Sequence, residues 1–301
     1  MNVNSFIDHV VMTLYCANTS WGHNREWWRS QEEGAKWQWL IVDLDRGFNI
    51  NNLYTNLVDN LMEDYDLFQY LLNSEYFKNQ FIQRAASHFS NTFHPDRIIG
   101  IVDSLSNIIS SEMPRHINLW GSEGGIASME VWENELEDIK QFSELRISVL
   151  LNQFISELDL DGSIQLRVNI EPPSSGRVLI NEVPMISPNG VGIFFKNKPV
   201  SLLAIPEPGY QFIGWEEVSD SVIINYNCSS DTMFTAVFQS SDEQILPSLI
   251  SQNTTLVNNQ PYAVLQDLTI SEGVTLTISE GVEIRMSENG NIIIEGQLMI
   301  N

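Results

Sequence analysis

Asp43 and Asp45 are the residues of this sequence best suited to hold a metal ion. They end the segment 37–45, whose aromatic and β-branched residues lie between Gly34 and Gly47, and this pattern predicts a β-strand. Residues two apart on a strand point to the same side, about 7 Å apart along the backbone. Two carboxylates at that spacing favour binding of a hard divalent cation.

The same acid pair has two other interpretations. It is also typical of a solvated strand end in which one carboxylate pairs with Arg46, since acidic pairs close in sequence are common. A glycoside hydrolase that uses both acids against the neighbouring tryptophans is the weakest alternative, because the two carboxylates of such enzymes usually come from separate elements across a cleft.

A polar segment rich in aromatic residues, 18–29, precedes the predicted strand. We expect a binding loop here, because loops so dense in Asn, His and Trp are unusual without a ligand. The Asn24 side chain offers an amide oxygen that can join two carboxylates around a metal. The alternative is a loop whose indole rings only close the packing between helix and strand, and this accounts at least for Trp21 and Trp28.

Helical periodicity dominates residues 1–158, apart from the strand at 37–45. The helix that precedes the polar loop is predicted over 5–14, with Asn2 or Asn4 as its cap. Further predicted helices cover 53–62, 65–72, 76–89, 98–109 with Pro95 in the first turn, and 132–158. Glycines at 121–125 interrupt this pattern.

Short alternating runs between Pro, Gly, Asn and Ser replace the helical period after residue 158, and they predict strands and tight turns. Residues 159–239 read as one small β domain. Residues 255–301 contain the repeated sequence Ser-Glu-Gly-Val at 271 and 279, which indicates the start of a parallel β-solenoid with one or two turns. The expected fold class is therefore α+β multidomain, and the chain reads as a fragment at both ends.

The composition excludes several classes of function. The 15 basic against 39 acidic residues give a net charge of -24, so nucleic acid is a poor partner. Apolar runs are too short for a membrane-spanning segment. Cys16 and Cys228 are expected to be buried separately, and the histidines lack the spacing of a zinc site.

Several linked motifs in residues 1–158 resemble the CotH kinase family, the atypical protein kinases of spore-coat type. The first is Asn18-Thr19-x-Trp21-x-x-Asn24 followed by Trp28-Arg29, and the second is Lys36-Trp37-Gln38-Trp39-Leu40-Ile41-Val42-Asp43-Leu44-Asp45-Arg46-Gly47-Phe48. The segments Phe77-x-x-x-Phe81-Ile82-x-Arg84 and Glu112-Met113-Pro114-Arg115-His116-Ile117-x-x-Trp120 are similar as well. The resemblance covers the C-terminal lobe of such a kinase.

This resemblance implies Mg²⁺ and ATP as cofactors. It implies a catalytic and metal-binding role for Asp43, metal binding by Asp45, and metal and cofactor binding by Asn24. Ser20 stands where the family has its catalytic Asp, and a hydroxyl cannot accept a proton at neutral pH as a carboxylate does. The small lobe, with its phosphate-contacting Lys and paired Glu, is not found before Met1, so the chain alone is expected to be inactive.

The segment 200–238 is similar to the InlB B-type repeat, a small β-grasp-like module of secreted and surface proteins. There Tyr210, Phe212 and Trp215 are expected to fill a small core next to the turns at Gly209 and Gly214. This similarity implies a bacterial protein that is secreted or displayed on the cell surface.

The leading hypothesis is therefore a secreted or cell-surface kinase of CotH type, with a protein substrate phosphorylated on Ser or Thr. The alternative is a non-catalytic relative that acts as a surface adhesin or scaffold protein and binds a surface partner. Ser20 and the missing small lobe favour the alternative, whereas Asn24 with Asp43 and Asp45 favours the kinase.

Overall fold

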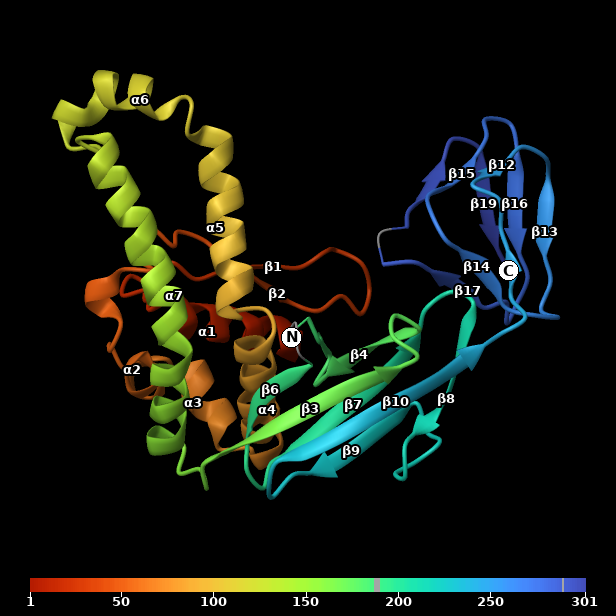
Figure 1. Cartoon of the computed structure of the whole chain (residues 1–301), viewed down its shortest axis with the longest axis horizontal. Coiled ribbons are helices and arrows are strands. Elements are labelled where there is room, and N and C mark those ends of the chain that lie inside the picture. Colours follow the sequence, from red (N-terminus) through yellow and green to blue (C-terminus); the bar gives the residue numbers. More distant parts are fainter. Residues whose placement is uncertain (187–189, 289) are drawn as a thin grey trace. The chain divides into compact units, whose positions relative to one another are not determined.

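The computed structural model describes residues 1–186, 190–288 and 290–301, and it shows a mixed α+β chain with helices in the N-terminal half and many strands after them (Figure 1). Contacts divide the chain into two units. The first comprises Met1–Leu166, Met185–Val200 and Tyr226–Thr232, and the second Arg167–Pro184, Ser201–Asn225 and Met233–Asn301. The domain boundaries at 158, 239 and 255 stay predictions. Among the described residues, no helix combines the length and apolar character that a membrane crossing needs.

The helices of the first unit confirm the helical periods of the sequence. They are α1 (Val3–Cys16), α2 (Leu57–Asp64), α3 (Asp66–Leu72), α4 (Glu75–Ser90), α5 (Pro95–Ile109), α6 (Met113–Trp120) and α7 (Met129–Glu157), with short 3-10 turns at Ile50–Asn52 and Gly121–Glu123. Asn2 caps α1 by accepting a hydrogen bond from the Ser5 N–H, and Pro95 begins α5. The separate helix α6 was not predicted.

Aromatic side chains fill the core between α1, α4 and α7. Phe6 on α1 is fully buried and its ring lies 6.2 Å from that of Phe77 on α4. Phe81 on α4 stacks on Phe154 of α7 at 5.3 Å. Burying rings of this size supplies much of the hydrophobic free energy of such a core.

Arg146 on α7 is the largest of the fully buried side chains described. Its guanidinium donates to the carbonyl oxygens of Leu14 at 2.7 Å and Tyr15 at 3.1 Å, at the end of α1, and also to those of Leu53 and Thr55. Burial lowers the pKa of Arg146 to about 10, so the side chain stays charged at neutral pH. A cation at the carbonyl end of a helix is favourable, and Arg146 thereby fixes where α1 ends.

The predicted strand at 37–45 is mostly wrong. Only Gln38–Leu40 forms a strand, β2, which pairs antiparallel with the unpredicted strand β1 (Glu26–Trp28), so that Glu26 lies opposite Leu40. β1 begins at Glu26, so no partner strand continues beyond Leu40. Asp43 then adopts a positive φ of 50°, which a strand does not allow but an Asp tolerates.

Strand β6 (Val191–Phe195) packs against α4 within the first unit. The Ser90 hydroxyl on α4 donates to the carbonyl of Ile193 at 3.1 Å and accepts from its N–H at 2.9 Å. Phe195 stacks on Phe154 at 5.8 Å. Gly192 is needed there, since a Cβ at this position would lie 2.9 Å from the Cβ of Ser90.

Two four-stranded sheets follow the helices, in the orders β6-β3-β10-β8 and β5-β4-β7-β9. Their remaining strands are β3 (Ser163–Glu171), β4 (Gly176–Ile180), β5 (Val183–Pro184), β7 (Pro199–Pro206), β8 (Tyr210–Trp215), β9 (Ile223–Asn227) and β10 (Thr232–Ser240). Trp215 is buried, as predicted, and Phe212 packs edge-on against it at 5.8 Å. Gly209 provides the turn before β8 with a φ of 87°.

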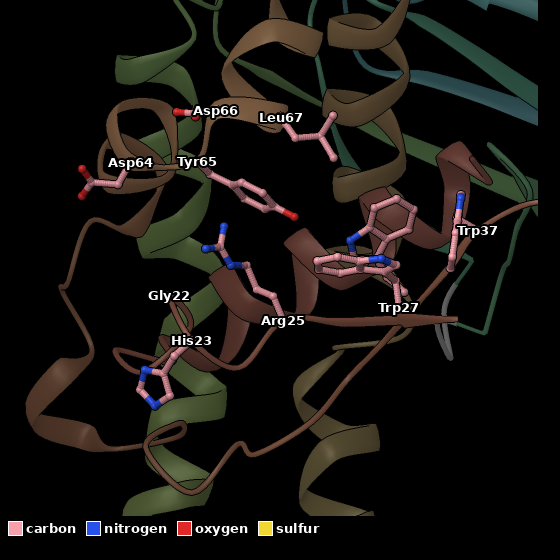
Figure 2. A pocket seen from close by; sticks show the side chains of 10 residues that line it. Gly22, His23, Arg25, Trp27, Trp37, Asp64, Tyr65, Asp66 and Leu67 are labelled. Carbon is pink, nitrogen blue, oxygen red and sulfur yellow. The ribbon is translucent and has the colours of Figure 1, made fainter. Parts of the chain in front are cut away.

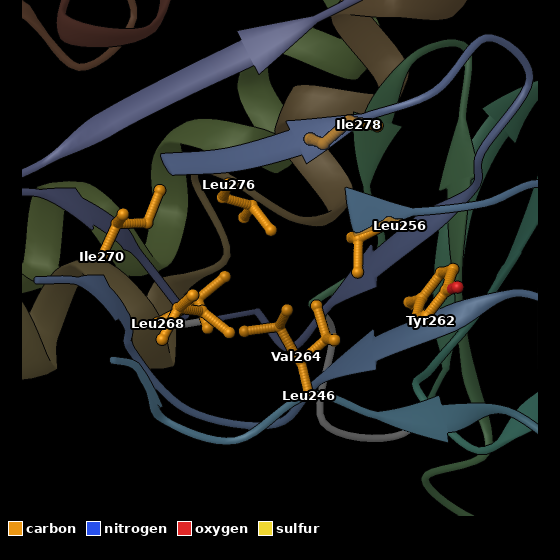
Figure 3. Close-up of a cluster of buried hydrophobic side chains, with 9 residues drawn as sticks. Leu246, Leu256, Tyr262, Val264, Leu268, Ile270, Leu276 and Ile278 are labelled. Atoms are coloured by element: carbon orange, nitrogen blue, oxygen red, sulfur yellow. The ribbon is translucent and has the colours of Figure 1, made fainter. Parts of the chain in front are cut away.

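The last part of the chain forms three parallel three-stranded sheets. Their orders are β11-β14-β17, β12-β15-β18 and β13-β16-β19, so each pass of the chain adds one strand to each sheet. The strands are β11 (Gln244–Ile245), β12 (Leu249–Ile250), β13 (Thr254–Leu256), β14 (Tyr262–Val264), β15 (Leu268–Ile270), β16 (Thr275–Ile278), β17 (Ile284–Met286), β18 (Ile292–Ile294) and β19 (Gln297–Ile300). Apolar side chains such as Leu268, Ile270 and Leu276 meet between the sheets (Figure 3). Two of these passes, β14–β16 and β17–β19, lie within the predicted range 255–301, and a further pass, β11–β13, begins before it.

Candidate active site

Three residues singled out in the sequence, Ser20, Asn24 and Asp43, come together through the side-chain amide of Asn24. Its nitrogen Nδ2 donates to Oδ2 of Asp43 at 2.9 Å and to the hydroxyl of Ser20 at 3.2 Å. The ring nitrogen Nε2 of His23 lies 3.2 Å from the same hydroxyl. A hydroxyl, an amide, an imidazole and a carboxylate therefore form one polar cluster on the segments that flank the β1–β2 hairpin.

Asn18 positions both segments of this cluster. It is buried, it follows the left-handed residue Ala17 that ends α1, and its Oδ1 accepts from the Ser20 N–H at 3.0 Å. Its Nδ2 donates to the carbonyl of Asp43 at 3.2 Å. The sequence places Asn18 in the first CotH-like motif, but no role was predicted for its side chain. An Asn directly after a helix end is the signal that could have indicated one, because such side chains often bond nearby backbone groups.

Asp45 is not brought into the cluster. The predicted same-face geometry of Asp43 and Asp45 required a continuous strand, and it is wrong because the chain leaves the strand after Leu40. Beyond it, the Gly47 N–H donates to Leu44 and the Phe48 N–H to Cys16, which turns the backbone toward the end of α1. Asp45 is exposed there, and among the described residues no hydrogen bond or ion pair joins its carboxylate to the cluster.

The side chains present fit a hard metal ion in part. Asp43 offers carboxylate oxygens and Asn24 an amide oxygen, which are ligands that Mg²⁺ accepts together with waters and phosphate oxygens. In the described part of the chain, no three His, Cys, Asp or Glu side chains gather around a possible metal position. An ion here would therefore depend on Asn24, whose amide would turn to present its oxygen.

His9 on α1 holds the hairpin from the other side. Its Nδ1 lies 3.1 Å from the carbonyl oxygen of Leu40, the last residue of β2. Burial lowers the pKa of His9, and the nearby charge of Arg25 acts in the same direction, although the Leu40 carbonyl opposes both. The imidazole is thus kept neutral and donates one hydrogen bond that fixes the end of the strand.

Two pockets open beside the cluster and share a wall formed by Gly22, His23, Arg25 and Asp64. The first pocket, of about 620 Å³, contains Ser20 and Arg46 in its lining. The second, of about 550 Å³, is lined by the indoles of Trp27, Trp37 and Trp39 and by residues at the junction of α2 and α3 (Figure 2).

Residues 1–150 match the family CotH kinase protein. Neither a curated protein nor a solved structure matches the chain. The matched range includes Ser20, Asn24, Asp43 and Asp45, so the part of the chain that holds the polar cluster is similar to CotH kinase proteins.

Proposed function

We propose that the helical part of this chain is the large lobe of a CotH-type atypical protein kinase, which transfers phosphate from ATP to Ser or Thr of a protein. The observation that carries the proposal is the amide of Asn24, which links the carboxylate of Asp43 to the hydroxyl of Ser20. The family match over residues 1–150 supports it.

In this proposal, Asp43 and Asn24 hold Mg²⁺ through oxygen atoms, and Asp45 adds negative charge from the exposed turn that follows. When bound, ATP would supply the phosphoryl group and Mg²⁺ would neutralise its negative charge. The protein then has to position the acceptor hydroxyl and receive its proton.

Ser20 and His23 divide that second task. The Ser20 oxygen accepts a hydrogen bond from the acceptor hydroxyl and orients it. As that oxygen takes the acceptor's proton, the Ser20 hydroxyl proton passes to Nε2 of His23, 3.2 Å away. An imidazole can act as a base at neutral pH, which a serine hydroxyl alone does not. His23 thus replaces the carboxylate that the family resemblance leads one to expect at residue 20.

A non-catalytic surface adhesin or scaffold protein is the second candidate function. Ser20 at the position of the catalytic carboxylate favours it. We further propose that the sheets after α7 form a β-grasp-like module, that the parallel strands from Gln244 onward are coils of a β-solenoid, and that the protein works outside a bacterial cell, secreted or on its surface. The resemblance of residues 200–238 to surface modules supports this location.

The substitution Ser20→Asp in the full-length gene product separates the two functions. If the site is catalytic, a carboxylate at residue 20 should raise the rate of phosphate transfer from labelled ATP to a protein acceptor by roughly 10²-fold. Ser30→Asp, which adds the same charge in the neighbouring loop, should leave the rate unchanged. Transfer absent from the wild type and from both variants would favour the scaffold.

A further inference from the structure

The two pockets described above differ in chemistry, although they share a wall. The pocket next to Ser20 is lined by two guanidinium groups, from Arg25 and Arg46, against one carboxylate, from Asp64. The neighbouring pocket is lined by the rings of Trp27, Trp37, Trp39 and Tyr65 and also by the carboxylates of Asp64 and Asp66. Arg25 belongs to the shared wall and so faces both spaces.

Arg25 uses the faces of its guanidinium for ring contacts. The central carbon Cζ lies 4.7 Å from the centre of the Tyr65 ring and 5.5 Å from that of Trp21. These contacts hold the group in place and leave its edge, with five N–H donors, for other partners. A guanidinium fixed in this way is preorganised to bind a carboxylate or phosphate through two parallel hydrogen bonds.

The pocket next to Ser20 carries a formal charge of +1, from Arg25 and Arg46 against Asp64, in a chain of net charge -24. Some basic residues elsewhere pair with acids, as Arg84 does with Asp8 and Lys140 with Asp103, whereas others, such as Arg29, form no ion pair within the described residues. Within the described residues, no ion pair joins Arg25 or Arg46 to a carboxylate. Two guanidinium groups beside a pocket that no ion pair neutralises favour an anionic ligand there.

The aromatic pocket offers large indole surfaces. Trp27 is 54% exposed and Trp37 is 40% exposed, although such rings gain much free energy from burial. Arg29 stacks over the Trp37 ring at 5.0 Å and holds it in position. Exposed indoles that line a concave space are typical of binding sites for apolar or aromatic groups.

We propose that the two pockets together bind an acceptor peptide in which an acidic side chain stands between a serine and an aromatic side chain. The acidic group binds the edge of Arg25 in the shared wall, the aromatic ring packs on Trp27 and Trp37, and the serine hydroxyl reaches Ser20. Phosphorylation of this peptide rests on the proposed kinase function, whereas its binding does not.

The test follows the tryptophan fluorescence of this chain during titration with short synthetic peptides, in the absence of ATP and metal. Ala-Ser-Glu-Phe-Ala and Ala-Phe-Glu-Ser-Ala sample both chain directions. We expect one of them to bind, replacement of its Glu by Gln to weaken binding at least tenfold, and replacement of its Phe by Leu to weaken it severalfold. These peptide changes leave the protein untouched, so they cannot act through misfolding.

Variants of the protein then locate the contact. Arg25→Gln should lower the affinity for the Glu peptide at least tenfold and abolish the preference for Glu over Gln. Arg115→Gln removes an equal charge from the exposed helix α6 and should change nothing. The coupling between Arg25 and the peptide carboxylate is the decisive quantity, because a general loss of structure would not produce it.

Three results would overturn the proposal: no binding of either peptide, equal binding of the Glu and Gln peptides, or an unchanged preference in Arg25→Gln. A fluorescence response to inorganic phosphate or ATP that depends on Arg25, without any response to the peptides, would assign the pocket to nucleotide phosphates instead. Peptide binding without phosphate transfer in the full-length product would contradict the kinase function and leave this inference standing.

Discussion

The polar cluster in the first unit and the parallel strands from Gln244 onward are held in place by different means. Around the cluster, single polar side chains bind specific backbone groups: Arg146 binds the last carbonyls of α1, and Asn18 binds the backbone of Ser20 and Asp43. In the parallel strands, each pass places apolar side chains at equivalent positions, and neighbouring passes cover one another.

This contrast explains which part a substitution should disturb. An anchor used once has no substitute, so its loss should move the backbone that it holds. A repeated apolar contact is shared by neighbouring strands, so its loss should weaken one pass and leave its register intact.

Arg146→Met should give the largest loss of folding stability. It removes a fully buried guanidinium and leaves the carbonyls of Leu14, Tyr15, Leu53 and Thr55 without their donor, at a cost of about 4 kcal/mol in the free energy of unfolding. Urea unfolding followed by the helical circular dichroism signal measures it. Arg115→Met on the exposed surface is the matched control, and equal losses in the two variants would contradict an anchoring role.

Leu276→Ala tests the parallel strands. Leu276 is fully buried in their core, so truncation should cost about 3 kcal/mol and lower the stability of the second unit. Leu265→Ala, at a position 47% exposed, should cost well under half of that. Urea unfolding followed by the circular dichroism signal of the strands measures both losses. Suppose instead that Leu276→Ala lowered the stability measured by the helical signal as much as Arg146→Met does. The claim that this repeated contact acts only on its own pass would then be refuted.

The carboxylate of Asp8 on α1 contributes less to the stability of the fold, and its contribution depends on pH. Burial alone would raise the pKa of Asp8, but hydrogen bonds from His88, at 2.8 Å, and from Arg84, at 2.6 and 2.8 Å, outweigh it and lower the pKa below the ordinary 3.8. A lowered folded-state pKa stabilises the protein above the unfolded-state pKa. That stability disappears as the pH falls through the folded-state value.

Asp8→Asn should therefore cost about 1 kcal/mol at pH 6, a modest value because the carboxylate is 36% exposed. The difference between wild type and variant should shrink below about pH 4. Urea unfolding at a series of pH values checks this. A difference that stays constant down to pH 2 would show that the carboxylate charge is not what stabilises this contact.

The regular elements could be predicted from the sequence, because their signal is local. The apolar period of α1 and α4 marks their buried faces, and the repeated Ser-Glu-Gly-Val marks the turns that follow β15 and β16. The strand predicted over 37–45 is wrong for a physical reason. Its residues have strand propensity, but the partner strand β1 is too short to pair beyond Leu40. Tertiary hydrogen bonds then determine the backbone conformation.

The candidate site was predictable in composition but not in geometry. Ser20, Asn24 and Asp43 could be named from residue type and motif, and the structure brings them together. The separation of Asp45, the approach of His23 to Ser20 and the anchoring by Asn18 depend on loop backbone with positive φ values at Ala17 and Asp43. Side-chain alternation carries no information about such turns.

A thermal-shift titration with Mg²⁺ tests the central claim, that Asp43 and Asn24 form a divalent metal site. At roughly ten times the dissociation constant, the wild type should gain about 4 °C in Tm. Asp43→Asn should abolish most of this gain, and Asp45→Asn should reduce it less, since only Asp43 contacts Asn24. Glu63→Gln, which removes an equal exposed charge from α2, should respond as the wild type does. Equal magnesium responses of the wild type and all three variants would contradict the claim and leave the acids as solvated side chains.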